Sequence, residues 1–503
     1  MKKAAIIGAG IAGIGTAIHL ANKGYQVEVF EANSYAGGKL SEFWKDGFRY
    51  DAGPSLFTLP ERVEELILKS GKKVEDYFSY KRLDTINKYF WEDGTKLEAS
   101  ADIEEFARQL EKEIGEPKEN VLKFLKNSKE KYDLTADLFL TRSLHKAETF
   151  FNKTALKAVS QIWKLELFKT MNQANNSKFE KDKTVQLFNR YATYNGSSPY
   201  VAPALLNVIP HLEFNKGAFL PTGGMFDITK SLVKLGQDLG VIYHFNKKVE
   251  EILIDKTQNK ITGIRVKDSK TENSVNQKTE NLDFDVVVSN MDIVHTYKKL
   301  LPQEKAPEFL LQQQKSSSAL IFYWGMNAEY KELDLHNIFF TKEYRKEFNA
   351  LFNGKTLYED PTIYIFVSSK HIKTDAPKGC ENWFVMINAP HNRNDGSQDW
   401  DTLIKKAKKD IIKKLERILM RNVEENIISE SILDPRKIEL RTSSLGGSLY
   451  GNSSNNRYAA FLRHANFSKT KGLYFCGGSV HPGGGIPLAL SSAKIVGEMI
   501  ENA

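Results

Sequence analysis

Three glycines near the start of the chain have the spacing that binds a diphosphate. Gly8, Gly10 and Gly13 form a G-x-G-x-x-G motif, and Glu31 follows at about the offset, roughly 20 residues, of an acid that accepts ribose hydroxyls. The first glycine permits a tight turn, the second leaves room for phosphate at the backbone, and the third allows close helix packing. An acid at Glu31 repels a 2′-phosphate, so the motif predicts a dinucleotide that lacks one.

The elements around these residues must bring them to one edge of a sheet. The sequence predicts a strand over residues 3–7, a helix over about 14–23 that stops at Gly24, and a second strand over 26–30. The N-terminus of that helix offers unpaired N–H groups and a positive dipole end to phosphates. A glycine-rich turn without a ligand is the alternative, but it leaves the order of strand, glycines, helix, strand and acid unexplained.

The next fifty residues resemble the continuation of an FAD motif in flavoprotein oxidases and desaturases. Residues 31–40 match E-x-x-x-x-x-G-G-[KR], and residues 47–55 match G-[FY]-x-x-D-x-G-[PS]. The resemblance implies FAD, with backbone at Gly37 and Gly38 against the phosphates and ribityl chain, and Lys39 as an added cation. The further FAD contacts predicted in this part of the chain are Ile11, Ala12, Ala32, Leu40, Gly53, Pro54 and Ser55.

Two later positions are also predicted to meet the cofactor. In FAD proteins of this type the backbone of the valine equivalent to Val249 meets the adenine, although a role of its side chain in a strand core is equally consistent. Asn290 ends an apolar strand, residues 284–289, with a small polar side chain near the expected cofactor.

The length, net charge and cysteine content of the chain limit the number of structural units and the classes of partner to expect. A chain of 503 residues is expected to form two or three units, and its net charge of +8 suits an anionic partner. The absence of a basic arm and of zinc-finger spacing predicts no nucleic-acid partner. The alternative to an anionic partner is that the positive charge belongs to an ordinary lysine-rich surface in contact with solvent. Cys380 and Cys476 lie far apart and outside any CxxC, which predicts a reducing compartment and no metal site.

The predicted fold class is α/β, with a discontinuous Rossmann-like FAD-binding domain. Residues 1–100, 216–294 and 441–503 are expected to form that domain, 101–215 a helical insertion, and 295–440 a mixed-sheet substrate domain. The apolar residues after Met1 are interpreted as the first strand rather than a signal peptide, because glycines interrupt them. No uncharged apolar run has the roughly 20 residues of a spanning helix.

A glycine-rich stretch near the C-terminus carries a second signature. Residues 472–478 predict a strand that enters a glycine turn, followed by His481-Pro-Gly-Gly-Gly-Ile-Pro487 and a helix over about 489–500. The positive end of this helix would face the flavin pyrimidine edge, which becomes anionic on reduction. The cofactor contacts predicted here are Gly478, Ser479, Ile486, Pro487 and Leu488.

This stretch resembles the H-P-G-[AG]-G-[IV]-P signature of the bacterial-type carotenoid (phytoene) desaturase family. Residues 221–225 and 446–451 agree with the same family, and the resemblance spans essentially the whole chain. Phytoene-acting members usually have G-A-G-I-P-G after the His-Pro. Here Gly-Gly-Gly-Ile-Pro-Leu is similar to members that desaturate 1-hydroxycarotenoids at the 3,4 bond. The resemblance implies a carotenoid substrate.

The resemblance also implies the chemistry: FAD takes a hydride from a C–H bond, and loss of a neighbouring proton makes a C=C bond. His481 is the best titratable candidate for proton acceptor, because histidine titrates near neutral pH. The alternatives are a histidine that only orders the Pro-Gly turn, with water or the flavin taking the proton. Many FAD proteins have an acid where Gly478-Ser479 stands, and no acidic base is matched in the insertion. Arg142 and Arg441 are candidates for the substrate's polar end or for surface ion pairs.

The sequence is also compatible with other functions. A phytoene desaturase or a carotenoid isomerase or oxygenase would use the same scaffold. Flavin amine oxidases and porphyrinogen oxidases share the N-terminal motif but not the His-Pro-Gly-Gly-Gly-Ile-Pro stretch. A non-catalytic prenyl-lipid-binding escort protein is the rival of another class, and the intact glycine motif weighs against it. The oligomeric state is not predicted.

Residues 138–171, called the aromatic segment below, predict a peripheral membrane protein on the cytoplasmic side. Aromatic residues alternate with lysines there on expected helices, so the rings would enter the headgroup region and the lysines would meet anionic lipid. The alternative makes the aromatics ordinary core. The residues concerned are Phe150, Phe151, Trp163 and Phe168 with Lys153, Lys157, Lys164 and Lys169.

Overall fold

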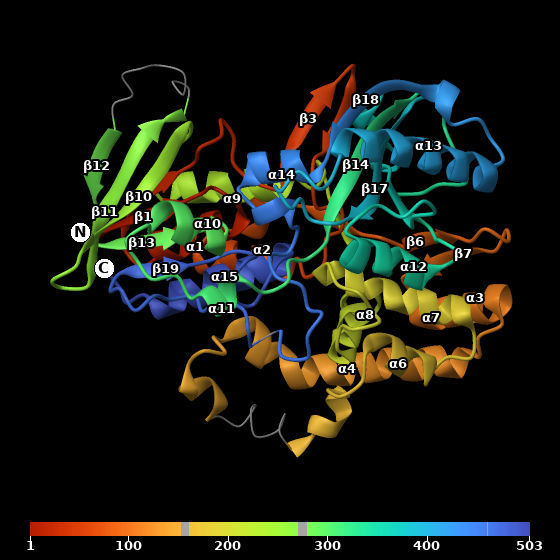
Figure 1. Ribbon diagram of the computed structural model, residues 1–503, viewed down its shortest axis with the longest axis horizontal. Coiled ribbons are helices and arrows are strands. Elements are labelled where there is room, and N and C mark those ends of the chain that lie inside the picture. Colours follow the sequence, from red (N-terminus) through yellow and green to blue (C-terminus); the bar gives the residue numbers. More distant parts are fainter. Residues whose placement is uncertain (152–159, 270–278, 460) are drawn as a thin grey trace.

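Two large sheets and a layer of helices make up the computed structural model, which describes residues 1–151, 160–269, 279–459 and 461–503. In Figure 1 the five-stranded parallel sheet lies on the side of both chain ends, and the seven-stranded sheet lies on the other side. The helices of residues 103–216 form a layer beneath the seven-stranded sheet. This is the α/β arrangement that the sequence predicts.

The parallel sheet is assembled from segments far apart in the chain. Its order is β19-β13-β1-β2-β9, and every pairing is parallel. Its strands are β1 (Lys3–Ile7), β2 (Gln26–Phe30), β9 (Ile242–His244), β13 (Val286–Ser289) and β19 (Leu473–Phe475). The central strands β1 and β13 are apolar because both of their faces are buried, whereas the edge strand β9 is partly exposed. Ala4 and Ile6 join the core with helices α1 and α15, while Ala5 and Ile7 join the core with β10 and β11.

Two helices begin earlier than the sequence predicts. Helix α1 (Ile11–Ala21) starts directly after Gly10, and α15 (Ile486–Met499) starts directly after Gly485. The predictions placed the starts at about 14 and 489. A glycine N-cap lets the chain turn into a helix at once, and Pro487 is tolerated in the first turn because no N–H partner is needed there. The earlier starts bring both N-termini closer to the glycine turns.

The seven-stranded sheet is mixed. Its order is β18-β14-β17-β16-β15-β6-β7, antiparallel except for the parallel pair β15–β6. Its strands are β6 (Thr85–Phe90), β7 (Lys96–Ser100), β14 (Ser318–Met326), β15 (His336–Phe339), β16 (Ile363–Phe366), β17 (Glu381–Ala389) and β18 (Ile427–Leu433). β6 and β7 lie within residues 1–100, so this predicted FAD segment also contributes to the second sheet. The predicted domain boundaries otherwise stay a prediction.

The helical layer contains one long helix and several short elements. Its helices are α3 (Ile103–Ile114), α4 (Lys118–Thr141), α6 (Met171–Asn176), α7 (Asp182–Asn189), η4 (Arg190–Asn195), η5 (Ala204–Val208), α8 (Ile209–His211) and η6 (Leu212–Lys216). The helices predicted for the aromatic segment are present at its two ends, where residues 138–141 form the last turn of α4 and Met171 begins α6. In the described residues between them, the chain forms the short turns η2 (Ala147–Phe150) and η3 (Ile162–Leu165). Its large aromatics face solvent, so no apolar stripe holds a longer helix against a core.

The remaining elements complete the two halves. The small sheets are β3 (Glu42–Lys45) with β4 (Phe48–Asp51), β5 (Tyr80–Arg82) with β8 (Phe219–Pro221), and β10 (Lys247–Asp255), β11 (Lys260–Asp268) and β12 (Thr279–Asp283). The remaining α-helices of the described chain are α2 (Glu61–Lys69), α9 (Asp227–Asp238), α10 (Ile293–His295), α11 (Glu308–Leu311), α12 (Tyr344–Asn349), α13 (Trp400–Leu419) and α14 (Pro435–Thr442).

Candidate active site

One cavity of about 710 Å³ connects the glycine motifs with the seven-stranded sheet. All predicted cofactor residues except Gly13 line it, and His481 lines it as well. Many of these residues come from the ends of β1, β2, β13 and β19 and from the N-termini of α1 and α15; the others are residues 37–40 before β3, residues 53–55 after β4, and Val249 on β10. The strand ends of a parallel sheet meet at one edge, which is where ligands bind in open α/β sheets.

The glycines of the first motif leave no room for side chains. A Cβ atom built on Gly10 would lie 2.7 Å from Asn290 Nδ2, and one built on Gly13 would lie 2.2 Å from the carbonyl oxygen of Gly8. Gly13 therefore packs α1 against the first turn and does not line the cavity itself. This close backbone cradle fits a diphosphate.

Two helix N-termini meet at this cavity. The N-cap residues Gly10 of α1 and Gly485 of α15 have no capping side chain among the described residues. The first N–H groups of both helices are therefore left for a ligand, and both dipoles place their positive ends there. This arrangement suits a cofactor that carries phosphates at one part and gains negative charge at another, as FAD does.

Glu31 accepts three hydrogen bonds from the chain itself, from the first glycine motif and from the loop after β2. Its Oε2 accepts the Ala9 N–H at 2.8 Å, and its Oε1 accepts both the backbone and side-chain N–H of Asn33 at 2.8 Å. Burial raises the pKa of this carboxyl, and these hydrogen bonds oppose the rise. A carboxylate has about four acceptor positions. Glu31 can thus accept one ribose hydroxyl in this arrangement, and binding both, as the sequence predicts, requires one loop contact to be exchanged.

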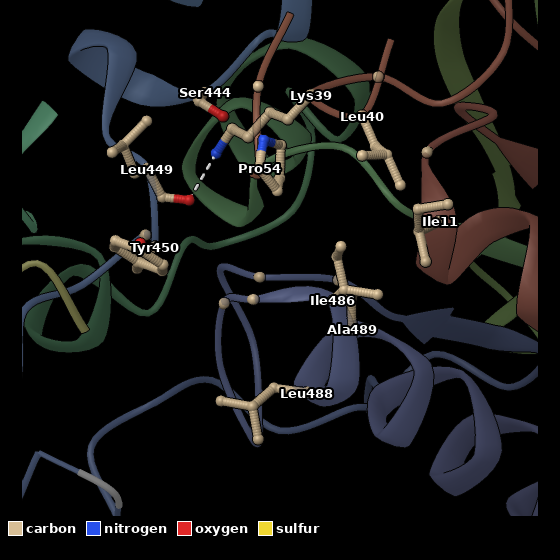
Figure 2. Close-up of a pocket in the computed structure, with 18 of the residues that line it drawn as sticks. Ile11, Lys39, Leu40, Pro54, Ser444, Leu449, Tyr450, Ile486, Leu488 and Ala489 are labelled. Carbon is tan, nitrogen blue, oxygen red and sulfur yellow. Dashed lines mark hydrogen bonds between the residues drawn. The ribbon is translucent and has the colours of Figure 1, made fainter. Parts of the chain in front are cut away.

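Lys39, the predicted cation of the FAD site, lines the cavity and is hydrogen-bonded to the chain. Its Nζ donates to the carbonyl oxygens of Ser448 and Leu449, each at 2.8 Å, and the second contact is drawn in Figure 2. Burial lowers the pKa of Lys39 to about 8. A buried ammonium needs acceptors, and two backbone carbonyls supply them here. Lys39 thereby ties the N-terminal FAD motif to residues 446–451.

His481 is buried and hydrogen-bonded to the chain. Its Nε2 donates to the carbonyl oxygen of Arg142 at 2.8 Å, and its peptide bond to Pro482 is cis. Burial lowers the pKa of His481 to about 4, so the ring is neutral at neutral pH, with its lone pair on Nδ1. The Arg142 side chain is exposed and lies 3.4 Å from the carboxylate of Asp137. This is the surface ion pair that the sequence predicts as one of its two possible roles. Arg441 lines the cavity and donates to the Tyr35 hydroxyl at 3.3 Å.

The half of the cavity beside the seven-stranded sheet was not predicted from the sequence. It is largely apolar, with walls from the helical layer and from the sheet. Its apolar lining includes Leu206, Ile209, Leu212, Ile321, Ile338, Phe384 and Met386. Polar side chains also line it, among them Asn87, Arg190, Glu213 and His336. The four polar residues come from the separate elements β6, η4, η6 and β15, and no sequence motif contains them. The local spacing of residues therefore could not predict this part of the site.

The family model that matches this chain is that of the flavin-containing amine oxidoreductases, over residues 11–498. Among curated proteins, a 1-hydroxycarotenoid 3,4-desaturase from Flavobacterium sp. is 52% identical over 100% of this chain and 99% of its own length. A 4,4′-diapophytoene desaturase from Staphylococcus haemolyticus is 32% identical over 99% of this chain and 98% of its own length.

Solved structures agree on the fold. An oxidoreductase from Methanosarcina mazei superposes with a TM-score of 0.59 and 14% identity, covering 99% of this chain and all of that one. Putrescine oxidase bound to putrescine gives a TM-score of 0.60 at 13% identity, covering 99% of this chain and 97% of its own. At such identities the likeness concerns the fold alone. Together with the full-length relatives, it leads to one conclusion: this chain belongs to the carotenoid desaturases of the flavin-containing amine oxidoreductase family.

Proposed function

We propose that this protein is an FAD-dependent desaturase that oxidises the 3,4 bond of a 1-hydroxycarotenoid. The observation that carries the proposal is the single cavity in which the predicted cofactor residues continue into an apolar channel. A long polyene needs such a channel, and a flavin desaturase needs it to open beside the cofactor. The full-length relative at 52% identity supports the choice of substrate.

The chain's own residues would bind, orient and dry the reacting groups. FAD, when bound, accepts the hydride removed from the carotenoid C–H bond. The glycine cradle and the two helix N-termini hold the cofactor, and the apolar walls exclude water and align the polyene. His481 stays the candidate proton acceptor through Nδ1, since its Nε2 is occupied by the Arg142 carbonyl.

Substrate choice is the direct test. Anaerobic mixing of the purified holoprotein with a 1-hydroxycarotenoid in liposomes should bleach the flavin and yield the 3,4-desaturated product. Phytoene should bleach it far more slowly, because the relative of highest identity named above acts on a hydroxylated carotenoid. Efficient conversion of phytoene to lycopene would overturn the substrate assignment, and bleaching by an amine alone would favour an amine oxidase.

We further propose that the aromatic segment docks the protein on a membrane. Phe151, Trp163 and Phe168 are 85%, 70% and 90% exposed. Buried rings would favour the core alternative, and these rings are not buried. The segment begins in the last turn of α4, where Phe139 lines the cavity and packs edge-on against Phe461 at a centroid separation of 6.2 Å. Because Phe139 of the same segment lines the cavity, a segment docked on lipid would let an insoluble substrate pass from the bilayer into the channel.

The basic part of this docking surface is smaller than the sequence predicts. Lys164 pairs with Glu130 at 3.0 Å, and Lys169 lies 3.9 Å from Glu166. Lys153 and Lys157 lie outside the described residues. No helix in the described part of the chain is both long enough and apolar enough to span a bilayer. Docking would thus depend more on the aromatic rings than on lysine charge.

Replacing the exposed rings should release the protein from lipid. The triple variant Phe151→Ser, Trp163→Ser and Phe168→Ser is expected to lose most of its sedimentation with anionic liposomes, because each ring loses its apolar contact with the bilayer. The control is Met420→Ser, an equally exposed apolar residue (86%) just after α13. In Figure 1, α13 and the helical layer lie at opposite ends of the seven-stranded sheet. Equal sedimentation of both variants with the liposomes would show that this segment is not the docking surface.

A further inference from the structure

The apolar half of the cavity contains a cluster of buried polar atoms without partners. Asn87 Nδ2, Arg190 Nε and His336 Nε2 have no hydrogen-bond partner within the part of the chain that the structure describes. All three side chains line the cavity, and the residues are 2%, 6% and 2% exposed. Buried polar groups are nearly always paired, so three unpaired ones at one cavity wall indicate a polar ligand group there.

These three residues lie together because the sheet and η4 meet. In the parallel pair β6–β15, Lys88 is opposite Asn337, so Asn87 and His336 occupy the preceding position on each strand. Arg190 Nη2 donates to the Tyr89 hydroxyl at 3.1 Å. Tyr89 is two residues beyond Asn87 and therefore on the same face of β6. Three elements thus bring the cluster to one place.

The cluster is built for a neutral ligand group. Arg190 Nη2 lies 3.6 Å from Glu213 Oε2, so its positive charge is already balanced. Glu213 also accepts the Tyr191 hydroxyl at 2.6 Å. A carboxylate or phosphate would meet no uncompensated charge here. A hydroxyl can accept from the Asn87 amide or from Arg190 Nε and can donate to His336 Nε2.

The cluster also lies close to the predicted cofactor contacts. His336 Nδ1 is 2.8 Å from the Tyr364 hydroxyl, which is 2.8 Å from Ser55 Oγ. Ser55 is one of the predicted FAD contacts. In a 1-hydroxycarotenoid the hydroxyl is only a few covalent bonds from C3 and C4. A site for that hydroxyl must therefore be near the reacting bond, and this cluster is two hydrogen bonds from Ser55.

We propose that Asn87, Arg190 and His336 bind the substrate hydroxyl and select hydroxylated carotenoids over otherwise identical ones that lack it. The inference rests on the proposed function and adds the residues that determine its specificity. A hydrocarbon end would leave the three polar atoms buried and unpaired, which penalises the wrong substrate more than a lost contact alone.

The test compares two substrates that are both saturated at the 3,4 bond, one with the 1-hydroxyl and one without. Wild type should reduce its flavin with a much higher kcat/KM for the hydroxylated substrate. Asn87→Leu, which loses no hydrogen bond of its amide nitrogen, should lower that kcat/KM about tenfold, as expected for one lost hydrogen bond. It should leave the kcat/KM of the other substrate unchanged or raise it. His336→Phe keeps the ring that stacks on Phe366 and should act in the same direction.

Thr184→Val is the matched control. Thr184 Oγ1 is also buried and without a partner in the described chain, but Thr184 lies on α7 and is not among the cavity-lining residues. It should leave both kcat/KM values unchanged, and flavin content shows that each variant folds. An equal fall for both substrates in Asn87→Leu and His336→Phe, or equal rates in wild type, overturns the hydroxyl site. Flavin reduction by neither substrate overturns the proposed function instead.

Discussion

Gly10→Val is expected to yield a folded protein that purifies with less than about a tenth of the flavin bound by wild type. The backbone at Gly10 adopts φ −73° and ψ 167°, so valine is not excluded by backbone strain. It is excluded by space, since even a Cβ atom lies 2.7 Å from Asn290 Nδ2. The Asn290 side chain must move, and the remaining methyl groups then occupy the predicted diphosphate site at the N-terminus of α1.

The flavin absorbance per polypeptide measures this effect directly. The matched control is Gly354→Val, because Gly354 is exposed and a Cβ there makes only an ordinary contact, 3.6 Å from Thr356 Cγ2. The control should retain full flavin and the far-UV circular dichroism of wild type. A Gly10→Val protein with full flavin occupancy would mean that the motif does not hold the diphosphate.

Arg49→Met is expected to lower the free energy of unfolding by about 3–5 kcal/mol, the usual cost of removing one partner from a buried charge cluster. Arg49 is buried and lies 2.6 Å from Glu42, 2.9 Å from Asp51 and 3.1 Å from Asp375. Burial opposes its charge, yet these carboxylates together raise the pKa of Arg49 above its usual value. Without the guanidinium, Asp51 and Asp375 have no cation beside them in the described part of the chain, whereas Glu42 keeps Lys230 at 3.1 Å.

The loss should also loosen the turn before α9. Asp51 accepts the backbone N–H groups of Met225 and Phe226, each at 3.0 Å, and so links the second FAD motif to residues 221–225. The midpoint of urea unfolding at neutral pH measures the effect. Arg108→Met removes an exposed pair with Glu105 at 2.8 Å and should leave the midpoint unchanged. Similar midpoints for the two variants would contradict the buried cluster's role.

The cofactor half of the site was predictable because its motifs are local. A G-x-G-x-x-G between a strand and a helix has few other physical uses, so Gly8, Gly10 and Glu31 could be placed before the fold was known. The C-terminal signature was predictable for the same reason, and Ile486 and Pro487 lie at the cavity as expected. The differences in this half concern the helix starts: with glycine N-caps, α1 and α15 begin a few residues earlier than the sequence predicts.

Individual contacts within those motifs depended on distant partners. Lys39 bonds to carbonyls some 410 residues away, and Nε2 of His481 to a carbonyl 339 residues away. No local pattern determines where a buried ammonium or imidazole finds its partner. The sequence predicts Lys39 as an added cation and His481 as a candidate proton acceptor, and only the fold shows that Lys39 Nζ and His481 Nε2 donate to backbone carbonyls.

The sequence by itself determined the cofactor class, the parallel sheet and the family, because each depends on short motifs whose backbone geometry is imposed locally. Only the tertiary structure shows which residues form the cavity wall where we propose that the end of the polyene binds. Asn87, Arg190 and His336 are unremarkable in sequence, and they become a cluster only where β6, β15 and η4 meet at one cavity wall. Packing between segments that are far apart in the sequence creates that wall, so the local spacing of residues could not predict it.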